Sequence, residues 1–168
     1  MKHILGIDPG LDGGFVMIDD DGKIVHQSIM PVIKLESIKA KKKSIKKVLD
    51  LQGIDKLLRE LNPTMAYLEW VSARPGNGNV SMFNFGCGFG ALEMGLVATA
   101  TPYVLVRPQT WSKVMHLGIS KNIDAKDRSL MVFKRSYPGI NLRASDRCTT
   151  VHSGMLDALL IAEYGRRL

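Results

Sequence analysis

Apolar residues follow a strand-like spacing in the first part of the 168-residue chain. Apolar runs of strand length occupy residues 3–8 and 14–19, and apolar positions recur near every second residue in 23–30. The turn-forming segments DPGLDGG and DDDG separate these runs. Because tight turns join neighbouring antiparallel strands, this region predicts an antiparallel meander of three strands.

Helical spacing begins near residue 52. From there the pattern alternates between helices and further strands. The expected strands are 64–70 and 102–108, with a short edge strand in KKVLDL (46–51); the expected helices are 53–61, 80–100, 109–117, about 121–136, and a last one ending at Gly165. Residues 80–100 contain one charged residue, Glu93, and therefore predict a buried helix in which Gly86, Gly90 and Gly95 allow close packing.

A meander followed by alternating helices and strands predicts an α/β fold, with a mixed five-stranded sheet flanked by helices. No repeat and no Pro/Gly/Ser-rich linker divides the sequence, so we expect a single domain over residues 1–168. Apolar residues make up 45% and charged residues 23%, a composition typical of folded globular proteins. No uninterrupted apolar run suggests a membrane span, and two cysteines are too few for a disulfide framework. We therefore expect a soluble protein of a reducing compartment, without a secretory signal.

Positive charge is concentrated in one segment. Residues 34–47, called the lysine block below, contain seven lysines and one glutamate, a net charge of +6 out of +7 for the whole chain. A basic segment on a nearly neutral body indicates a contact with a polyanion, most often a nucleic acid. A solvated lysine-rich loop is the alternative interpretation.

Three carboxylates occur where apolar elements end or continue. Asp8 ends the first apolar run, Glu69 ends the strand TMAYLEW, and Asp157 interrupts the apolar last helix. Acids are rarely buried unless they are paired or bind a metal. Oxygen ligands of this kind suit Mg²⁺ or Mn²⁺, and two such ions can act on a phosphodiester. The alternative for each acid singly is a cap, a turn or an exposed face.

Five ordered segments carry a family resemblance: GIDPGLDGG (6–14), a strand ending in Glu69, RPGNGNVSMFNFG (74–86), VRPQTWSK (106–113) and HSGMLDALLIAEYGRR (152–167). Together they resemble the RuvC-type Holliday junction resolvases of the RNase H-like superfamily, and most of all their phage and prophage branch. The resemblance implies a cytoplasmic homodimer that takes part in DNA recombination and repair. It also implies symmetric nicking of four-way or branched DNA to 5′-phosphate and 3′-hydroxyl ends, without a nucleotide cofactor.

The resemblance further implies roles for individual residues. Asp8, Glu69 and Asp157 would bind two Mg²⁺ or Mn²⁺ ions, and Lys113 would meet the scissile phosphate. The family has a further acid or histidine about one turn before the last aspartate, where this chain has His152, Ser153 and Gly154. His152 is the expected stand-in, as a metal ligand and a catalytic group, with Asp146 less favoured. Two alternatives follow: a weakly active or inactive junction-binding protein, and an RNase H-like enzyme acting on RNA–DNA hybrids.

The predicted DNA contacts come from three regions. They are Lys41, Lys42, Lys43, Lys46 and Lys47 in the lysine block; Arg74, Asn77, Asn79, Ser81 and Phe83 after Glu69; and Lys121 and Lys126 in the basic helix. Phe85 could stack on a base or be buried, whereas Trp111 is expected to be a core residue. By the resemblance, the helix at 80–100 would form the interface of the homodimer.

Overall fold

The computed structural model describes residues 2–39, 42–72 and 78–168, with the side chains of residues 37–44 left undescribed. Its central sheet has the strand order β3-β2-β1-β6-β7. The strands are β1 (Ile4–Asp8), β2 (Gly14–Ile18), β3 (Ile24–Ile29), β6 (Met65–Glu69) and β7 (Tyr103–Val106). Strands β1, β2 and β3 pair antiparallel, whereas β6 is parallel to both β1 and β7. The predicted meander and the mixed five-stranded sheet are confirmed.

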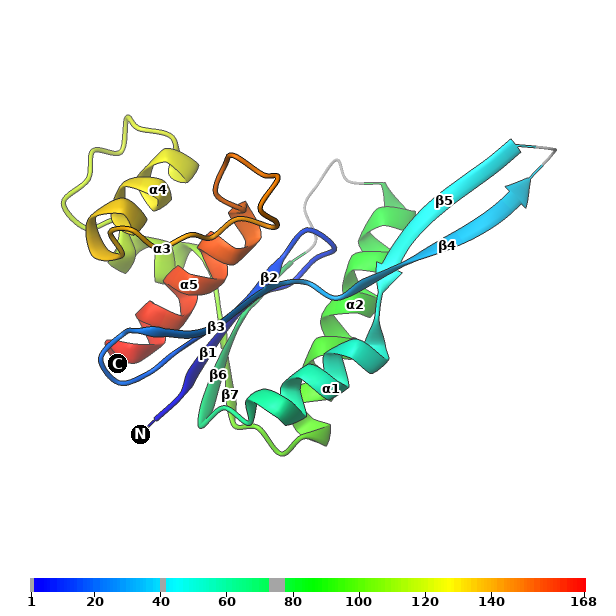
Figure 1. The fold of residues 1–168 in the computed structure, drawn as a ribbon, viewed down its shortest axis with the longest axis horizontal. Coiled ribbons are helices and arrows are strands. Elements are labelled where there is room, and N and C mark those ends of the chain that lie inside the picture. Colours follow the sequence, from blue (N-terminus) through cyan, green and yellow to red (C-terminus); the bar gives the residue numbers. More distant parts are fainter. Residues whose placement is uncertain (1, 40–41, 73–77) are drawn as a thin grey trace.

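Helices cover both faces of this sheet (Figure 1). One face carries α3 (Pro108–Met115), α4 (Ala125–Ser136) and α5 (Ser153–Arg166). The other carries α1 (Leu51–Leu61) and α2 (Asn79–Ala98). The α1 helix ends where the sequence predicts, because Asn62 adopts a left-handed conformation and Pro63 follows. Helix α4 begins later than predicted, because Asp124 caps it by accepting a hydrogen bond from the Lys126 amide.

The period of two along β1 and β6 decides which face each residue meets. Leu5, Ile7 and Leu68 pack with α1 and α2, whereas Ile4 and Tyr67 pack with α5. Gly6 also lies on the α5 side, where a Cβ atom would collide with the Ala158 carbonyl oxygen. The alternation therefore places Asp8 and Glu69 on the face that α5 covers.

The lysine block forms a hairpin that is separate from the central sheet. Strands β4 (Val32–Lys39) and β5 (Lys42–Leu49) pair antiparallel as a two-stranded sheet, which projects from the body (Figure 1). This corrects the interpretation of the block as a loop. The short strand expected in KKVLDL is present as the end of β5, where it pairs with β4. The β5 strand is longer than predicted, and Leu51 already belongs to α1. Register places Lys34 directly opposite Lys47, a like-charge pair that disfavours pairing.

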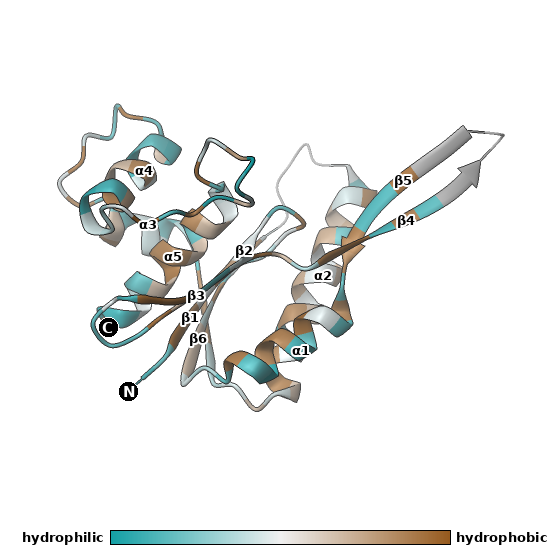
Figure 2. Cartoon of the chain, viewed as in Figure 1, coloured by the Kyte–Doolittle hydropathy of each residue, from teal (hydrophilic) through white to brown (hydrophobic). Residues whose placement is uncertain are grey.

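Helix α2 is exposed over most of its length, contrary to the prediction of a buried helix. Its buried residues are Leu92 and Leu96, which pack with α1 and the sheet, and Gly95 contacts Leu58 of α1. Gly86 and Gly90 have no atom near the place where a Cβ would lie, so they do not serve close packing within this chain. Among the described residues α2 is the helix long and apolar enough, by length and composition, to cross a membrane. Its apolar residues extend along the helix in Figure 2.

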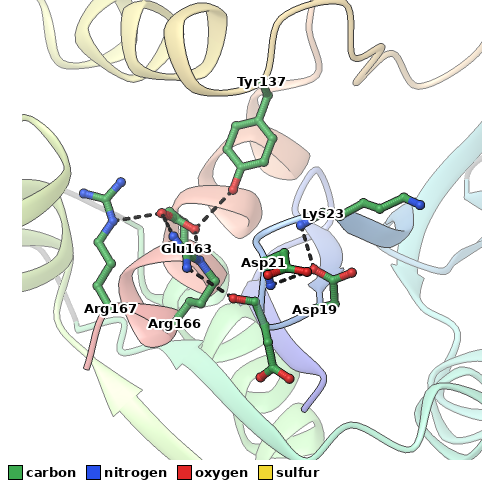
Figure 3. A network of polar contacts seen from close by, with 8 residues as sticks. Asp19, Asp21, Lys23, Tyr137, Glu163, Arg166 and Arg167 are labelled. Carbon is green, nitrogen blue, oxygen red and sulfur yellow. Dashed lines mark hydrogen bonds and ion pairs between the residues drawn. The ribbon is translucent and has the colours of Figure 1, made fainter. Parts of the chain in front are cut away.

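A network of charged groups fixes the end of α5 (Figure 3). Glu163 is 4% exposed and accepts hydrogen bonds from Arg166 Nε at 2.7 Å, Arg167 Nε at 2.8 Å and the Tyr137 hydroxyl at 3.3 Å. Arg166 also donates to the Asp20 carbonyl oxygen at 3.3 Å, which connects the helix to the β2–β3 turn. Burial tends to raise the pKa of Glu163, but the hydrogen bonds and charges of Arg166 and Arg167 outweigh it and hold the pKa below 4.5.

Glu163→Gln should therefore lower the free energy of unfolding by about 2 kcal/mol at neutral pH, the typical value of hydrogen bonds to a charged group. A carboxylate with a lowered pKa stabilises the fold above its unfolded value of 4.5, and this contribution is lost as the pH falls through the folded pKa. Urea unfolding of both proteins should show the difference shrinking at acidic pH. Glu60→Gln is the control, because the Glu60–Lys56 pair on α1 is exposed and spans 3.7 Å. An equal loss in both variants would contradict the role of the network.

Candidate functional site

Asp8, Glu69 and Asp157 come together at one end of the sheet. Asp8 and Glu69 are the last residues of the parallel strands β1 and β6, whose register pairs Ile7 with Leu68. Asp157 lies in the second turn of α5, the helix that packs on the same face of β1. Carboxyl ends of adjacent parallel strands meet at one edge, so the topology brings together three acids that are far apart in the sequence.

The three carboxylates interact electrostatically. Burial, followed by the charge of Glu69 and then that of Asp157, raises the pKa of Asp8 to about 8. Burial and the charge of Glu69 raise the pKa of Asp157 to about 6, while the charge of Lys126 opposes this increase. Both shifts mean that the site disfavours its own negative charge, and a nearby cation would relieve that cost.

The donor chemistry of this site fits a divalent cation. Carboxylate oxygens are the ligands that Mg²⁺ and Mn²⁺ prefer. In the part of the chain that the structure describes, no three His, Cys, Asp or Glu side chains are grouped tightly enough to hold an ion as they stand. The fit therefore rests on the kind of donor and on the mutual repulsion of Asp8, Glu69 and Asp157.

Trp111 holds Glu69 in place. Its indole Nε1–H donates to Glu69 Oε1 at 2.8 Å. The ring is 5% exposed and packs in the core between the sheet and α5, as the sequence predicts for a core residue. The hydrogen bond adds a second role, that of positioning an acid of the site. Sequence reasoning missed it because nothing in QTWSK indicates which way the indole N–H points.

His152 caps α5 in this structure. Its Nδ1 accepts a hydrogen bond from the Met155 amide at 3.2 Å. An imidazole that accepts at Nδ1 carries its proton on Nε2, so this arrangement offers a hydrogen-bond donor and no ring nitrogen for a metal. Its geometry favours capping, and the predicted metal and catalytic roles of His152 stay predictions.

Gly154, the residue after the position expected to hold a further acid, is closely packed. A Cβ atom at Gly154 would collide with the Asp12 carbonyl oxygen and with Gly13 in the β1–β2 turn. Ser153 is the first residue of α5 and is exposed. A side chain one turn before Asp157 can therefore come from position 153 but not from position 154.

A cavity of about 730 Å³ opens at the acids. Asp8 and Glu69 line it together with Phe85 of α2 and with Arg107 and Gln109 at the start of α3. A second cavity of about 980 Å³ shares Asp8, Pro9, Ser81 and Phe85 with the first and reaches Lys46 and Lys47 of the hairpin. The two therefore form one groove from the acids to the lysine block. Phe85 is half-buried in the wall of this groove, between the two states considered from the sequence.

Three of the predicted DNA contacts line this groove: Lys46, Lys47 and Ser81. Lys46 Nζ donates to Asn84 Oδ1 of α2 at 3.4 Å, and Lys47 Nζ lies 3.5 Å from Asp12 Oδ1, so both lysines connect the hairpin to the site. The positive charge of Lys126 in α4 lowers the pKa of Asp157. All the described predicted contacts are exposed: Lys46, Lys47, Asn79, Ser81, Phe83, Lys121 and Lys126. Lys113 is exposed on α3 and does not line the groove. Lys41, Arg74 and Asn77, and the side chains of Lys42 and Lys43, lie outside the described residues.

Sequence reasoning also missed a pair of residues beside Glu69. The guanidinium carbon of Arg107 lies 5.0 Å from the centre of the Trp70 ring, in a cation–π arrangement. Both residues line the cavity of the acids. Their place in the sequence could have indicated them, because each immediately follows a parallel strand that ends at the site.

Comparison with known structures supports this fold. RuvC from Thermus thermophilus superposes with a TM-score of 0.57 at 15% sequence identity, covering 98% of this chain and 95% of that one. RuvC from T. thermophilus in complex with a Holliday junction substrate gives a TM-score of 0.55 at 13% identity, covering 98% of this chain and 92% of that one. No family model and no curated protein sequence matches the chain. The prediction of an RNase H-like fold of the RuvC type is confirmed; the assignment to the phage branch stays a prediction.

In cation-free protein, Asp8→Asn should raise the melting temperature at alkaline pH. Because the folded pKa of Asp8 is about 8 and the ordinary value is 3.8, the folded protein loses stability as the pH rises between these values. Above pH 8, the free energy of unfolding of Asp8→Asn should exceed that of the wild type by an amount on the order of a few kcal/mol. This difference should shrink as the pH falls toward the ordinary pKa of 3.8. Thermal unfolding in the presence of a chelator, measured across this pH range, tests the expectation.

Added Mn²⁺ should raise the melting temperature of the wild type more than that of Asp8→Asn, because the amide is a weaker ligand than the carboxylate. The control is Asp12→Asn, an acid in the same turn whose side chain is 86% exposed. If the melting temperatures of Asp8→Asn and the wild type depend on pH in the same way, the charge of Asp8 does not destabilise the fold.

Proposed function

We propose that this protein is an endonuclease that depends on Mg²⁺ or Mn²⁺ and resolves Holliday junctions and related branched DNA. The observation that carries the proposal is the electrostatic coupling of Asp8, Glu69 and Asp157 at one end of a RuvC-like fold. The similar structure of T. thermophilus RuvC contains a Holliday junction substrate, which supports branched DNA as the ligand class. The groove from the acids to the lysine block offers a basic path for such a polyanion.

The residues of the site have separate tasks in this proposal. Asp8, Glu69 and Asp157 would hold the cations, and Trp111 orients Glu69 through its indole N–H. Bound Mg²⁺ or Mn²⁺ supplies water activation and neutralises charge on the phosphodiester. Lys126 adds positive charge beside Asp157. Contact of Lys113 with the scissile phosphate stays a prediction from the resemblance, because Lys113 does not line the groove. The proposed products are a 5′-phosphate and a 3′-hydroxyl.

A homodimer is the second part of the proposal, and α2 carries it. Six of its exposed residues follow alternating steps of three and four: Val80, Phe83, Cys87, Gly90, Met94 and Val97. This is the spacing of a seam between paired helices, and Val80 and Phe83 are 76% and 72% exposed in the isolated chain. The opposite side of α2 is held to the body through Leu92, Leu96 and the hydrogen bond from Tyr103 to Glu93. Pairing along the seam would cover the exposed apolar face and give two sites for two strands.

Junction binding without cleavage is the alternative that a specific observation favours. The chain has Ser153 where the resemblance places a further aspartate, and a hydroxyl is a poor substitute for a charged ligand. Packing at Gly154 also keeps the next position from supplying a side chain. A site with three carboxylates binds a second cation more weakly than one with four. No feature of the described groove favours an RNA–DNA hybrid over a junction, and a comparison of the two substrates tests this activity.

Asp157→Asn should lower the rate of symmetric nicking of a labelled mobile four-way junction by at least about 100-fold, because the change removes a cation ligand. Binding of the junction in Ca²⁺ should remain, because the lysines of the hairpin are unchanged. Nicking rates are measured with Mn²⁺ on the junction and on an RNA–DNA hybrid of equal length, and junction binding is measured in Ca²⁺. Ser153→Asp should raise the nicking rate of the wild-type background by adding a carboxylate on the Asp157 side of α5.

Inert wild type and inert Ser153→Asp, with tight junction binding, would select the binding protein over the nuclease. Faster cleavage of the hybrid than of the junction would replace resolution by an RNase H-like activity.

Met94→Asp should convert the proposed dimer to a monomer, because it places a charge in the centre of the apolar seam, where Met94 is 58% exposed. Sedimentation velocity at several protein concentrations measures the change in mass. The control is Leu117→Asp, which adds the same charge at an apolar residue that is 79% exposed after α3. A wild type that sediments as a monomer at all concentrations would exclude the dimer and leave the nuclease proposal standing.

A further inference from the structure

Arg107 and Trp70 form a fixed pair beside the acids. The guanidinium carbon lies 5.0 Å from the centre of the indole ring. The Trp70 amide donates to the Val106 carbonyl oxygen at 2.8 Å, so the ends of β6 and β7 hold both residues in register. The Arg107 carbonyl oxygen accepts from the Thr110 amide at 2.9 Å, which fixes its backbone at the start of α3. This side chain is therefore positioned by the sheet, by the helix and by the ring of Trp70.

The pair faces the groove where the substrate would lie. Trp70 and Arg107 line the cavity that Asp8 and Glu69 also line, and Trp70 directly follows Glu69 in the chain. Trp70 is 43% exposed, so one part of the ring remains accessible. A nucleotide next to a phosphodiester held at the acids would therefore come within reach of this pair.

The chemistry of an arginine held by an aromatic ring suits a base edge. The cation–π contact with the indole restrains the guanidinium and leaves its N–H groups free to donate elsewhere. Among the described residues no carboxylate forms a salt bridge with Arg107, and no acceptor receives a hydrogen bond from its guanidinium. Two parallel N–H donors match O6 and N7 of guanine, whereas adenine presents a donor at the position of O6.

We infer that Arg107, held by Trp70, reads a guanine base adjacent to the scissile phosphate and so gives the enzyme a sequence preference. This inference rests on the proposed nuclease function and adds a base-reading subsite to it. Trp70 acts as a positioning residue, because it restrains the arginine that touches the base. A phosphate contact by Arg107 is the competing interpretation, and the two differ in how cleavage responds to sequence.

The test uses a set of four-way junctions that differ by one base pair at each position flanking the nicking point. The full-length wild type with Mn²⁺ should cleave fastest when guanine occupies one particular position. Arg107→Ala should lower that preference about 5- to 100-fold, while the rate on the other three bases changes little. Trp70→Ala should lower the preference in the same direction, and Trp70→Phe should retain most of it because a ring remains.

Arg59→Ala is the matched control, since it removes one arginine from α1, where Arg59 pairs with Asp55 at 2.9 Å away from the groove. A uniform loss of rate on all four bases in Arg107→Ala would identify a phosphate contact and overturn the base-reading role. A wild type that nicks junctions without preference for guanine would overturn it as well. A wild type that nicks no junction would instead reject the proposed function. Circular dichroism of each variant separates these outcomes from misfolding.

Discussion

The close approach of α5 to β1 is the constraint on which the rest of this structure depends. Gly6 lets the backbone at Ala158 come against the strand, and Gly154 does the same for the β1–β2 turn. With α5 this near, Asp157 reaches the carboxyl end of the strand that carries Asp8. Burial and the charges that such proximity brings together both raise the pKa values of Asp8 and Asp157. Under the proposed function, the stability lost through these raised pKa values is what the protein gives up in order to hold cations.

The electrostatics of the two ends of α5 are opposite. At its start, Asp157 has neighbouring acids, and burial leaves its charge poorly compensated. At its end, the buried Glu163 has two arginines beside it that keep its charge favourable. The same helix therefore carries one carboxylate whose charge is compensated, Glu163, and one whose charge is not, Asp157; under the proposed function the second binds cations. The difference lies in partners supplied by the chain itself, since both acids are withdrawn from solvent.

The sequence predicted the elements that local pattern controls. The meander, the parallel strand ending in Glu69 and the end of α1 at Asn62 follow from period, turn residues and caps. The prediction failed for α2, because an apolar composition does not reveal whether the covering surface belongs to the same chain or to another one. It also missed the hairpin, in which strands pair despite Lys34 facing Lys47. The Trp111–Glu69 hydrogen bond and the Arg107–Trp70 stack depend on side-chain direction across the sheet, which no linear pattern encodes.

Helix α2 has a further consequence for how a working site is assembled. One edge of this helix supplies Ser81 and Phe85 to the wall of the groove, and another edge carries the apolar seam. Under the proposed pairing, the surface that joins two chains and the surface that receives DNA are parts of a single rigid rod. Subunit association would then order the groove wall and the acids opposite it in one step. Dilution would then separate the subunits and lower the activity, without any ligand occupying the site.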